Sequence, residues 1–183
     1  MSAPISISKT LKRLPNDEVL TIAAGCFWGT EHMYRKHFVN KLVDCKVGYA
    51  NGTTSDPTYK AVCTGTTNHA EALQISYDPS VTSFKELIDF FFRMHDPTTI
   101  NSQGPDVGTQ YRSAIFTHSD EQSKIAKLSL EEAQKKWYPN NKIETIIEPI
   151  KSFYDAEEYH QKYLFANPSG YQCPSHFLRT APK

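Results

Sequence analysis

The sequence lacks a surplus of charge of either sign. Its 183 residues hold 20 Lys and Arg against 20 Asp and Glu, so the formal net charge at neutral pH is +0. Proteins that bind nucleic acid through charge carry a basic patch, and this balance does not predict one. Apolar runs are also short, well below the roughly 18 residues that a membrane span needs. We therefore expect no nucleic-acid partner and no membrane segment.

The N-terminal stretch MSAPISISKTLKRLPND lacks the charged start and apolar run that are typical of a secretory signal. We therefore expect a cytoplasmic protein. A chain of this length can bury an ordinary core, and no linker or internal repeat divides it. The sequence predicts one domain over residues 1–183, with a core at about 18–165 and a mobile tail at about 166–183.

Paired cysteine motifs are missing as well. The four cysteines, at 26, 45, 63 and 173, form no C-x-x-C pair and have no clustered histidine. This spacing argues against a structural zinc site, and we expect no metal. A permanent disulfide framework is not expected in a reducing compartment. Each thiol therefore has either a packing role or a role in thiol chemistry.

Hydrophobic patterns predict strands and helices in a regular order. Strands are predicted at 19–24, 42–49, 70–77, 111–117 and 142–150, and helices at 27–38, 84–91, 119–137 and 155–166. The central order is strand–helix–strand, twice, as in a split βαβ arrangement. The predicted fold class is α+β, with a ferredoxin-like split βαβ core (an α/β plait) and a long irregular C-terminal tail. The unpatterned segment 95–110 is long enough to predict a functional loop.

Cys26 differs from the other cysteines by its place in the chain. It lies in IAAGCFWGTE, after a predicted buried strand and just before a predicted helix. Free N–H groups and the positive end of the helix dipole lower the pKa of a thiol at such a position. Chance can also place a cysteine at a helix start. Spacing alone therefore supports a nucleophile and a packed cysteine about equally.

The remaining three cysteines have different surroundings. Cys45 shares a strand face with apolar residues, and it is expected to pack in the core. Cys63 lies between a loop and a strand, where packing is also expected. Cys173 lies in NPSGYQCPSHFLRTAPK, which predicts an exposed, mobile thiol. Such a thiol is either unselected surface or a partner for a second cysteine, because thiol–disulfide exchange needs in-line approach of the sulfurs.

Glu71 is predicted on the apolar face of a strand. Alternation in EALQISY places it on the same side as Leu73 and Ile75. Burial there raises the pKa of a carboxyl group, which is how a general acid is made. The alternative is that Glu71, at the end of the strand, turns out to water. The neighbouring loop and the tyrosines Tyr59 and Tyr111 favour the buried acid.

Five segments resemble, in order, signature segments of the A type of peptide methionine sulfoxide reductase. They are GCFWGTE, PTYKAVCTGTTNHAEALQISYDP, FFFRMHDPTT, QGPDVGTQYRSAIF and YHQKYLFANPSGYQCP. The resemblance implies a thiol-dependent reductase that converts the S-epimer of methionine sulfoxide, in proteins and free, back to methionine. It also implies a protein-repair role in oxidative stress, a monomer without bound cofactor, and thioredoxin as the external reductant, replaced by dithiothreitol in vitro.

The resemblance further implies a role for each site residue. Cys26 would attack the sulfoxide sulfur and become a sulfenic acid, with which Cys173, the one late cysteine, would form a disulfide. Glu71 would donate the proton to the sulfoxide oxygen. The other implied roles are Tyr59 and Tyr111 as hydrogen-bond donors to that oxygen, Phe27 and Trp28 as an apolar wall for the ε-methyl group, and Asp106 as organiser of the polar edge through water.

Two other classes of protein are alternatives. A cysteine hydrolase or acyltransferase would pair Cys26 with His69 or His160 and would form an acyl-enzyme. A binding module with an aromatic pocket would tolerate Cys26→Ser. Mass spectrometry after a single turnover separates the three classes, because the products are a disulfide, an acyl adduct or an unchanged protein.

Overall fold

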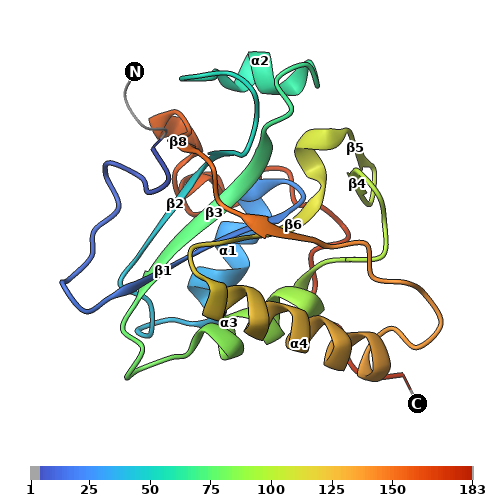
Figure 1. Cartoon of the computed structure of the whole chain (residues 1–183). Helices are drawn as coiled ribbons and strands as arrows, with labels where there is room; N and C mark the ends of the chain where they lie inside the picture. The colour runs from blue at the N-terminus through green and yellow to red at the C-terminus, as the bar shows by residue number, and fades with distance from the viewer. Residues whose placement is uncertain (1–4, 183) are drawn as a thin grey trace.

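One central sheet organises the molecule (Figure 1). The computed structural model describes residues 5–182; residues 1–4 and Lys183, at the two ends of the predicted domain, lie outside the described part. Within 5–182 the sheet has six strands, in the order β7-β6-β1-β3-β2-β8. The strands are β1 (Glu18–Ala24), β2 (Asp44–Ala50), β3 (Ala70–Tyr77), β6 (Ser113–Thr117), β7 (Ile146–Pro149) and β8 (Phe153–Asp155).

The four central strands, β6, β1, β3 and β2, are antiparallel, each to the next in the sheet. β1 lies between β3 and β6, and β3 lies between β1 and β2. Each strand–helix–strand unit is therefore split by a strand of the other unit. β7 is parallel to β6, and β8 is antiparallel to β2, so the sheet is mixed and extended at both edges. The prediction of a fold that combines helices with strands in one central sheet is thereby confirmed.

Three long helices cover one face of the sheet. They are α1 (Phe27–His37), α3 (Phe84–Met94) and α4 (Asp120–Lys136). Ser83 and Ser119 cap α3 and α4, because their side chains accept the backbone N–H groups of Glu86 and Gln122. In Figure 1, α3 and α4 lie side by side below the sheet. Among residues 5–182, no helix combines the length and the apolar character that crossing a membrane requires.

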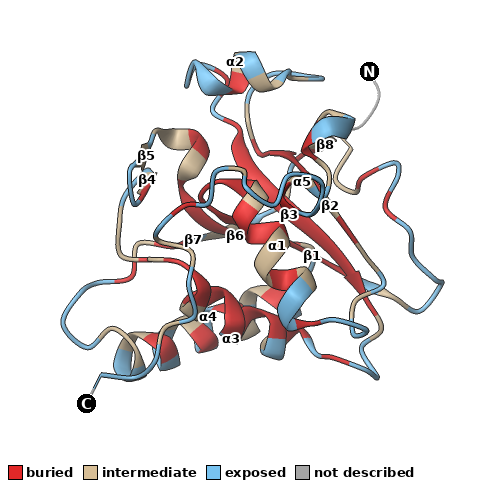
Figure 2. Cartoon of the chain, turned by 180° about the vertical axis from the view of Figure 1, so that it is seen from behind, coloured by how far each residue is buried: buried red, intermediate tan, exposed pale blue. Residues whose placement is uncertain are grey.

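The main core lies between the sheet and this helix layer. Figure 2 shows the buried residues gathered in the middle of the molecule and the exposed ones on the outer loops. β3 is buried along its whole length, because it is central in the sheet and covered on both faces. On the face away from the helices, the N-terminal segment closes the sheet: Ser8 N–H donates to Gln74 Oε1 at 2.7 Å, and Phe153 N–H donates to Ile5 O.

The predicted helix at 155–166 is wrong. The segment contains the last residue of β8, a 3₁₀ turn η2 (Glu158–His160) and one short helix α5 (Tyr163–Ala166). Tertiary contacts decide this: β8 pairs with β2, and Lys162 adopts a left-handed conformation with φ 54°. The sequence also gave no sign of α2 (Tyr59–Cys63), and segment 95–110 contains the short strands β4 (Ser102–Gln103) and β5 (Asp106–Val107).

Candidate active site

Cys26 lies between the end of β1 and the first residue of α1, as predicted. Gly25, just before it, has φ +86°, and a Cβ atom there would lie 2.7 Å from the side chain of Gln103. Only glycine fits both constraints, so the chain can turn sharply and present the thiol at the helix start. Cys26 is 8% exposed, so little of the thiol reaches solvent.

The expected low pKa of Cys26 is wrong for this state of the site. Burial, followed by the charge of Glu71, raises the pKa of the Cys26 thiol far above its ordinary value. The backbone N–H groups of Trp28 and Gly29 do lower that pKa, as a helix start should, but they do not outweigh the loss of water. Cys26 is therefore a neutral thiol in the described structure.

Glu71 is the buried acid that its strand position predicts. It is 1% exposed, and its Oε1 accepts the backbone N–H of Phe27 at 3.2 Å. Burial raises the pKa of Glu71 to about 8, although the Phe27 N–H opposes this. The second oxygen, Oε2, is buried without a protein partner among the described residues. A protonated carboxyl group thus lies beside Cys26 with one free oxygen, the arrangement of a proton donor.

Phe27 and Trp28 form an aromatic surface at the start of α1. Phe27 is fully buried, with its ring 5.8 Å from that of Tyr49 and 5.2 Å from that of His160. The Trp28 indole stacks on Tyr163 at 3.8 Å, and its Nε1–H donates to His160 Nδ1 at 2.9 Å. We call Phe27, Trp28, His160 and Tyr163 the aromatic wall. Its two last members lie more than a hundred residues from the first two, and sequence reasoning did not place them there.

The predicted tyrosines and Asp106 surround the same pocket. Tyr59 begins α2 and Tyr111 ends the turn η1 (Thr109–Tyr111). Burial, followed by the nearby Glu71, raises the pKa of both phenols, so both hold their protons and can donate. Asp106 in β5 accepts the hydroxyl of Tyr171 at 3.1 Å, and its charge raises the pKa of both Cys26 and Glu71. The structure thus brings Tyr59, Tyr111 and Asp106 close to Glu71.

Cys173 is not the exposed thiol that its sequence context predicts. It is 2% exposed, and its thiol lies 3.5 Å from the carbonyl oxygen of Gln103 in the 95–110 segment. Neighbouring tail residues close over it: Ser175 Oγ donates to Gln103 Oε1, and His176 Nε2 lies 2.6 Å from Ala24 O. Burial, followed by the hydrogen bond to Asp106, raises the pKa of Tyr171, which precedes Cys173 by two residues and lies near both Cys173 and Cys26.

The two remaining cysteines differ in their exposure to solvent. Cys45 is 1% exposed within β2, and its predicted core position is confirmed. Cys63 is exposed at the end of α2, so its predicted packing is wrong. The reason is that residues 59–63 form a short helix on the periphery, as Figure 1 shows at the top of the molecule. Burial raises the pKa of the Cys63 thiol, and the nearby side chain of Tyr59 opposes this.

The two histidines that a cysteine hydrolase would need are engaged elsewhere. His69 accepts the Gly52 N–H through Nδ1 at 2.9 Å, and its Nε2 lies 2.8 Å from Thr54 O, so the ring holds the 52–54 loop. His160 accepts the indole of Trp28. Neither forms a hydrogen bond with Cys26 in the described structure. Residues 5–182 also contain no group of three or more His, Cys, Asp or Glu side chains placed to hold a metal ion.

A buried thiol at a strand–helix junction, a protonated carboxyl beside it and a second buried thiol nearby define a class of protein: thiol oxidoreductases with an internal proton donor. Comparison with known proteins identifies the family. The family described as peptide methionine sulfoxide reductase matches residues 18–181. The peptide methionine sulfoxide reductase of Saccharomyces cerevisiae is 61% identical over 181 residues, which cover 94% of this chain and 97% of the relative.

Other relatives agree. The peptide methionine sulfoxide reductase MsrA of Methanothermobacter thermautotrophicus is 50% identical, over 82% of this chain and 88% of its own. The crystal structure of reduced Mxr1 from Saccharomyces cerevisiae has a TM-score of 0.91 at 60% identity, covering 95% of this chain and 99% of that one. Mxr1 in complex with Trx2 gives 0.69 at 46% identity, covering 96% and 99%. The chain belongs to the peptide methionine sulfoxide reductase family, in its A type.

Proposed function

We propose that this enzyme reduces the S-epimer of methionine sulfoxide, in proteins and free, with Cys26 as nucleophile and Glu71 as proton donor. The observation that carries the proposal is the pairing of a buried Cys26 thiol with a carboxyl group whose pKa is about 8. A sulfoxide sulfur becomes a better electrophile once its oxygen is protonated. The site holds the nucleophile and the acid together and out of water, so both act on one substrate.

The first step balances with these two groups alone. Glu71 gives its proton to the sulfoxide oxygen while the sulfur of Cys26 attacks, and the bond between methionine sulfur and oxygen breaks. A bond between that oxygen and the Cys26 sulfur forms in its place, so the protonated oxygen passes to Cys26 as a sulfenic acid and methionine leaves. The proton of the Cys26 thiol returns to Glu71. Because Cys26 is neutral before substrate arrives, bound sulfoxide has to promote the loss of the thiol proton.

The second step uses Cys173. Its thiol attacks the sulfenic acid sulfur of Cys26, a disulfide forms and water leaves. A dithiol then reduces the disulfide, and we propose thioredoxin as that partner. The solved complex of the yeast relative with Trx2 supports this assignment. Both thiols are buried in the described structure, so we propose that the tail moves when the disulfide forms.

The remaining assignments complete the proposal. Phe27 and Trp28 enclose the ε-methyl group, Tyr59 and Tyr111 hydrogen-bond the sulfoxide oxygen, and Asp106 orders the polar edge. We further propose a cytoplasmic monomer with a role in repair after oxidative stress, without a bound cofactor. The split order of the central strands supports a ferredoxin-like plait for the core.

A single-turnover experiment tests the proposal. The enzyme is mixed with each separate epimer of methionine sulfoxide without reductant, and methionine and protein mass are measured. We expect one methionine per enzyme from the S-epimer only, together with a protein about 2 mass units lighter, as one disulfide requires. An acyl adduct, or turnover of the R-epimer alone, would overturn it. Dithiothreitol should then restore repeated turnover.

A further inference from the structure

Where β1 ends, its two neighbours in the sheet are no longer joined by a strand. β1 stops at Ala24, and its pairing with β3 ends earlier still, at Ile22. Both neighbours run antiparallel to β1, so the starts of β3 and β6 flank the turn that leads to Cys26. The start of β3 carries Glu71, and the turn η1 before β6 carries Tyr111. The acid and a phenol of the proposed site thus lie on strand ends with no strand pairing between them.

Arg112 joins these two strand ends. It follows η1 and precedes β6, and it is 7% exposed. Its Nη1 donates to Thr109 O in η1 at 2.9 Å, and its Nη2 donates to Asn68 O, just before β3, at 3.1 Å. β3 and β6 are two strands apart, which is about 10 Å in a sheet, and the long side chain spans this distance. We call this pair of hydrogen bonds the Arg112 bridge.

The guanidinium of Arg112 is buried without an ion pair. None of the salt bridges within residues 5–182 involves it. Buried arginines are normally paired with carboxylates, because an unpaired buried charge is destabilising. Burial lowers the pKa of Arg112, although the charge of Glu148 opposes this. The side chain instead uses the property that distinguishes arginine from lysine, a planar fork that donates to two acceptors at once.

Both acceptor carbonyls belong to segments with their own hydrogen bonds. Asn68 has a left-handed φ of 55°, and the carbonyl oxygen of Thr67 before it accepts the Thr53 N–H at 2.8 Å. The Thr109 carbonyl oxygen also accepts the backbone N–H of Arg112 at 3.3 Å. The two carbonyls therefore move with the backbone of their loops, and a shift of one loop against the other would break the Arg112 bridge.

We propose that Arg112 is a positioning residue for oxygen transfer: its two hydrogen bonds hold Glu71 and Tyr111 at a fixed separation around the sulfoxide oxygen. This rests on the proposed function, in which Glu71 protonates that oxygen and Tyr111 hydrogen-bonds it. The two groups act together only if both reach one atom, and small misplacements lower the rate strongly. Because the apolar wall holds the methyl group, loss of the bridge should lower the saturated rate and leave the half-saturating substrate concentration nearly unchanged.

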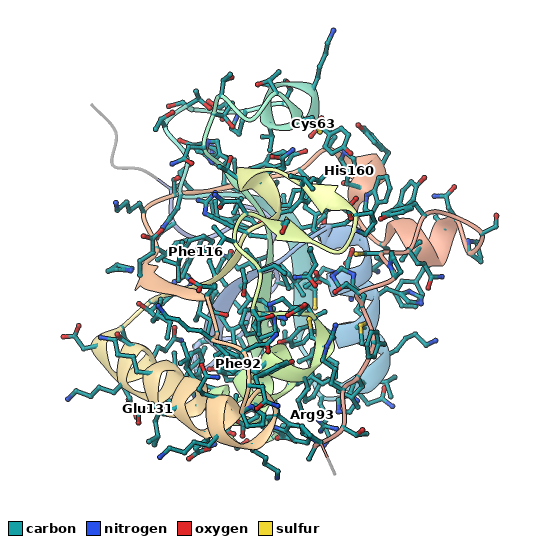
Figure 3. All side chains as sticks on the ribbon, turned by 90° about the vertical axis from the view of Figure 1, so that its right-hand side faces the viewer. Cys63, Phe92, Arg93, Phe116, Glu131 and His160 are labelled. Carbon is teal, nitrogen blue, oxygen red and sulfur yellow. The ribbon has the colours of Figure 1, made fainter. Side chains whose placement is uncertain are left out.

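Three variants test the Arg112 bridge. Arg112→Met keeps much of the length of the side chain and removes both donors. Arg112→Lys keeps the charge, but one ammonium group cannot replace a fork that reaches two separate carbonyls. Gln122→Met is the matched control, because it also removes a buried donor to a backbone carbonyl, Val19 O at 2.8 Å. Gln122 lies in α4, which Figure 3 labels at Glu131, well away from Cys63 of α2.

The first readout is single-turnover methionine formation against substrate concentration at pH 7. We expect the saturated rate to fall about tenfold in Arg112→Met and in Arg112→Lys, since two hydrogen bonds are lost or misplaced. The half-saturating concentration should stay within about twofold of the wild type, and Gln122→Met should match the wild type in both quantities. A wild-type rate in Arg112→Lys would show that charge and not the bridge matters. A rise in half-saturation at an unchanged rate would equally contradict the proposal.

The second readout is the pH dependence of the saturated rate. In the wild type this rate should fall as pH rises through about 8, because only protonated Glu71 can give its proton. Burial is the main cause of this raised pKa, and a looser start of β3 would admit water. The decline should therefore come about one pH unit lower in Arg112→Met. An unshifted decline in that variant would overturn the proposal.

Other titratable groups near Glu71 do not produce this decline. Burial raises the pKa of each thiol and phenol around it, so Glu71 is the first of these groups to lose its proton above neutral pH. The charged and titratable groups that face Glu71 are Cys26, Cys63, Asp106, Tyr49, Tyr59 and Tyr111.

The third readout is amide hydrogen exchange, which needs no substrate and so separates this proposal from the proposed function. In Arg112→Met the peptides that cover residues 66–71 and 108–113 should exchange about fivefold faster, because the bridge no longer holds the two loops together. A peptide within β2 should be unchanged, and Gln122→Met should leave both loops as in the wild type. Unchanged exchange in the two loops of Arg112→Met would overturn the proposal.

Thermal unfolding checks that the variants fold. If Arg112→Met does not fold, Arg112→Lys carries the same three readouts, because it retains the charge and most of the packing. Loss of sulfoxide reduction in the wild type, with the exchange response of the two loops intact, would instead contradict only the proposed function.

Discussion

The aromatic wall and the C-terminal tail lie against the same helix start and are held in different ways. The wall is held by contacts between side chains, a stacked pair and one buried hydrogen bond. The tail residues Cys173, Ser175, His176 and Arg179, which we call the tail clamp, are held mainly at backbone carbonyls: Gln103 O, Ala24 O and Arg93 O. Beyond the clamp, Phe177 and Leu178 are exposed.

This difference explains which part of the site can move. The tail beyond the clamp leaves its apolar residues Phe177 and Leu178 exposed, whereas the wall buries aromatic area in addition to its hydrogen bond. Local opening therefore begins where few apolar contacts are made. One feature makes the clamp close-fitting: a Cβ atom at Gly29 would lie 2.2 Å from His176 Nδ1, so glycine lets the tail approach α1. We expect the wall to stay in place through the reaction and the clamp to open.

The largest expected effect falls where the two regions meet. Cys26→Ser removes the sulfur that accepts the sulfoxide oxygen in the proposed reaction. Methionine formation from the S-epimer should therefore be abolished, even with dithiothreitol. The measurement is methionine released over time. Substantial turnover in this variant would mean that another group attacks the sulfoxide, and neither the wall nor the clamp would then have the role assigned to it.

Glu71→Gln tests the acid on the wall side of Cys26. The amide can donate a hydrogen bond but cannot transfer a proton, so we expect the first-turnover rate to fall by roughly 10²–10⁴. In the wild type this rate should fall as pH rises through about 8, because Glu71 loses its proton there. Stopped-time assays between pH 6 and 10 measure both. A loss below tenfold, or a high-pH decline that persists in Glu71→Gln, would reduce Glu71 to a positioning residue.

Cys173→Ser separates the two regions most clearly. The first turnover should be unchanged, because oxygen transfer needs only Cys26 and the acid, while thioredoxin-dependent turnover should be lost. Cys26 sulfenic acid should accumulate and be trapped by dimedone, and dithiothreitol should rescue turnover in part. Peptide mapping of the oxidised wild type is the check. A Cys26–Cys173 linkage is expected; a Cys26–Cys63 linkage would show that the clamp does not carry the resolving thiol.

The smallest effect concerns the clamp itself. His176→Gln can keep a donor for Ala24 O, whereas His176→Met has similar length and no donor. We expect His176→Met to leave the first turnover unchanged and to alter the rate of disulfide formation about fivefold, since one hydrogen bond is lost. Quenched samples resolved by mass measure that rate. Equal rates in both variants would show that the contact with Ala24 does not control the tail.

The sequence predicted local structure well where one short pattern was sufficient. The helix starts at Ser83 and Ser119, the buried strand before Cys26 and the buried Glu71 all follow from spacing of a few residues. Asn68 illustrates the same point: its φ is 55°, a conformation that asparagine tolerates better than most residues.

Predictions failed where distant segments meet. Cys173 is buried against Gln103. The two residues lie 70 positions apart, so the Gly/Pro-rich sequence around Cys173 could not predict this contact. The predicted final helix is broken because Glu157 accepts hydrogen bonds from Tyr49 and Tyr59. Cys26 has a raised pKa because the pocket removes water, an effect that outweighs the helix start seen in the sequence.

The sequence by itself therefore determined the order of the four central strands and the three long helices, the family, and the identity of the thiol and the acid, since these depend on residue type and near neighbours. Only the tertiary structure decided that Trp28 faces His160, 132 positions away, and that Cys173 is closed beneath its own tail. The physical reason is the same in both cases. Burial and long-range hydrogen bonds depend on which surfaces the folded sheet brings together. A local sequence pattern does not contain this information, because the contacting residues lie far apart in the chain.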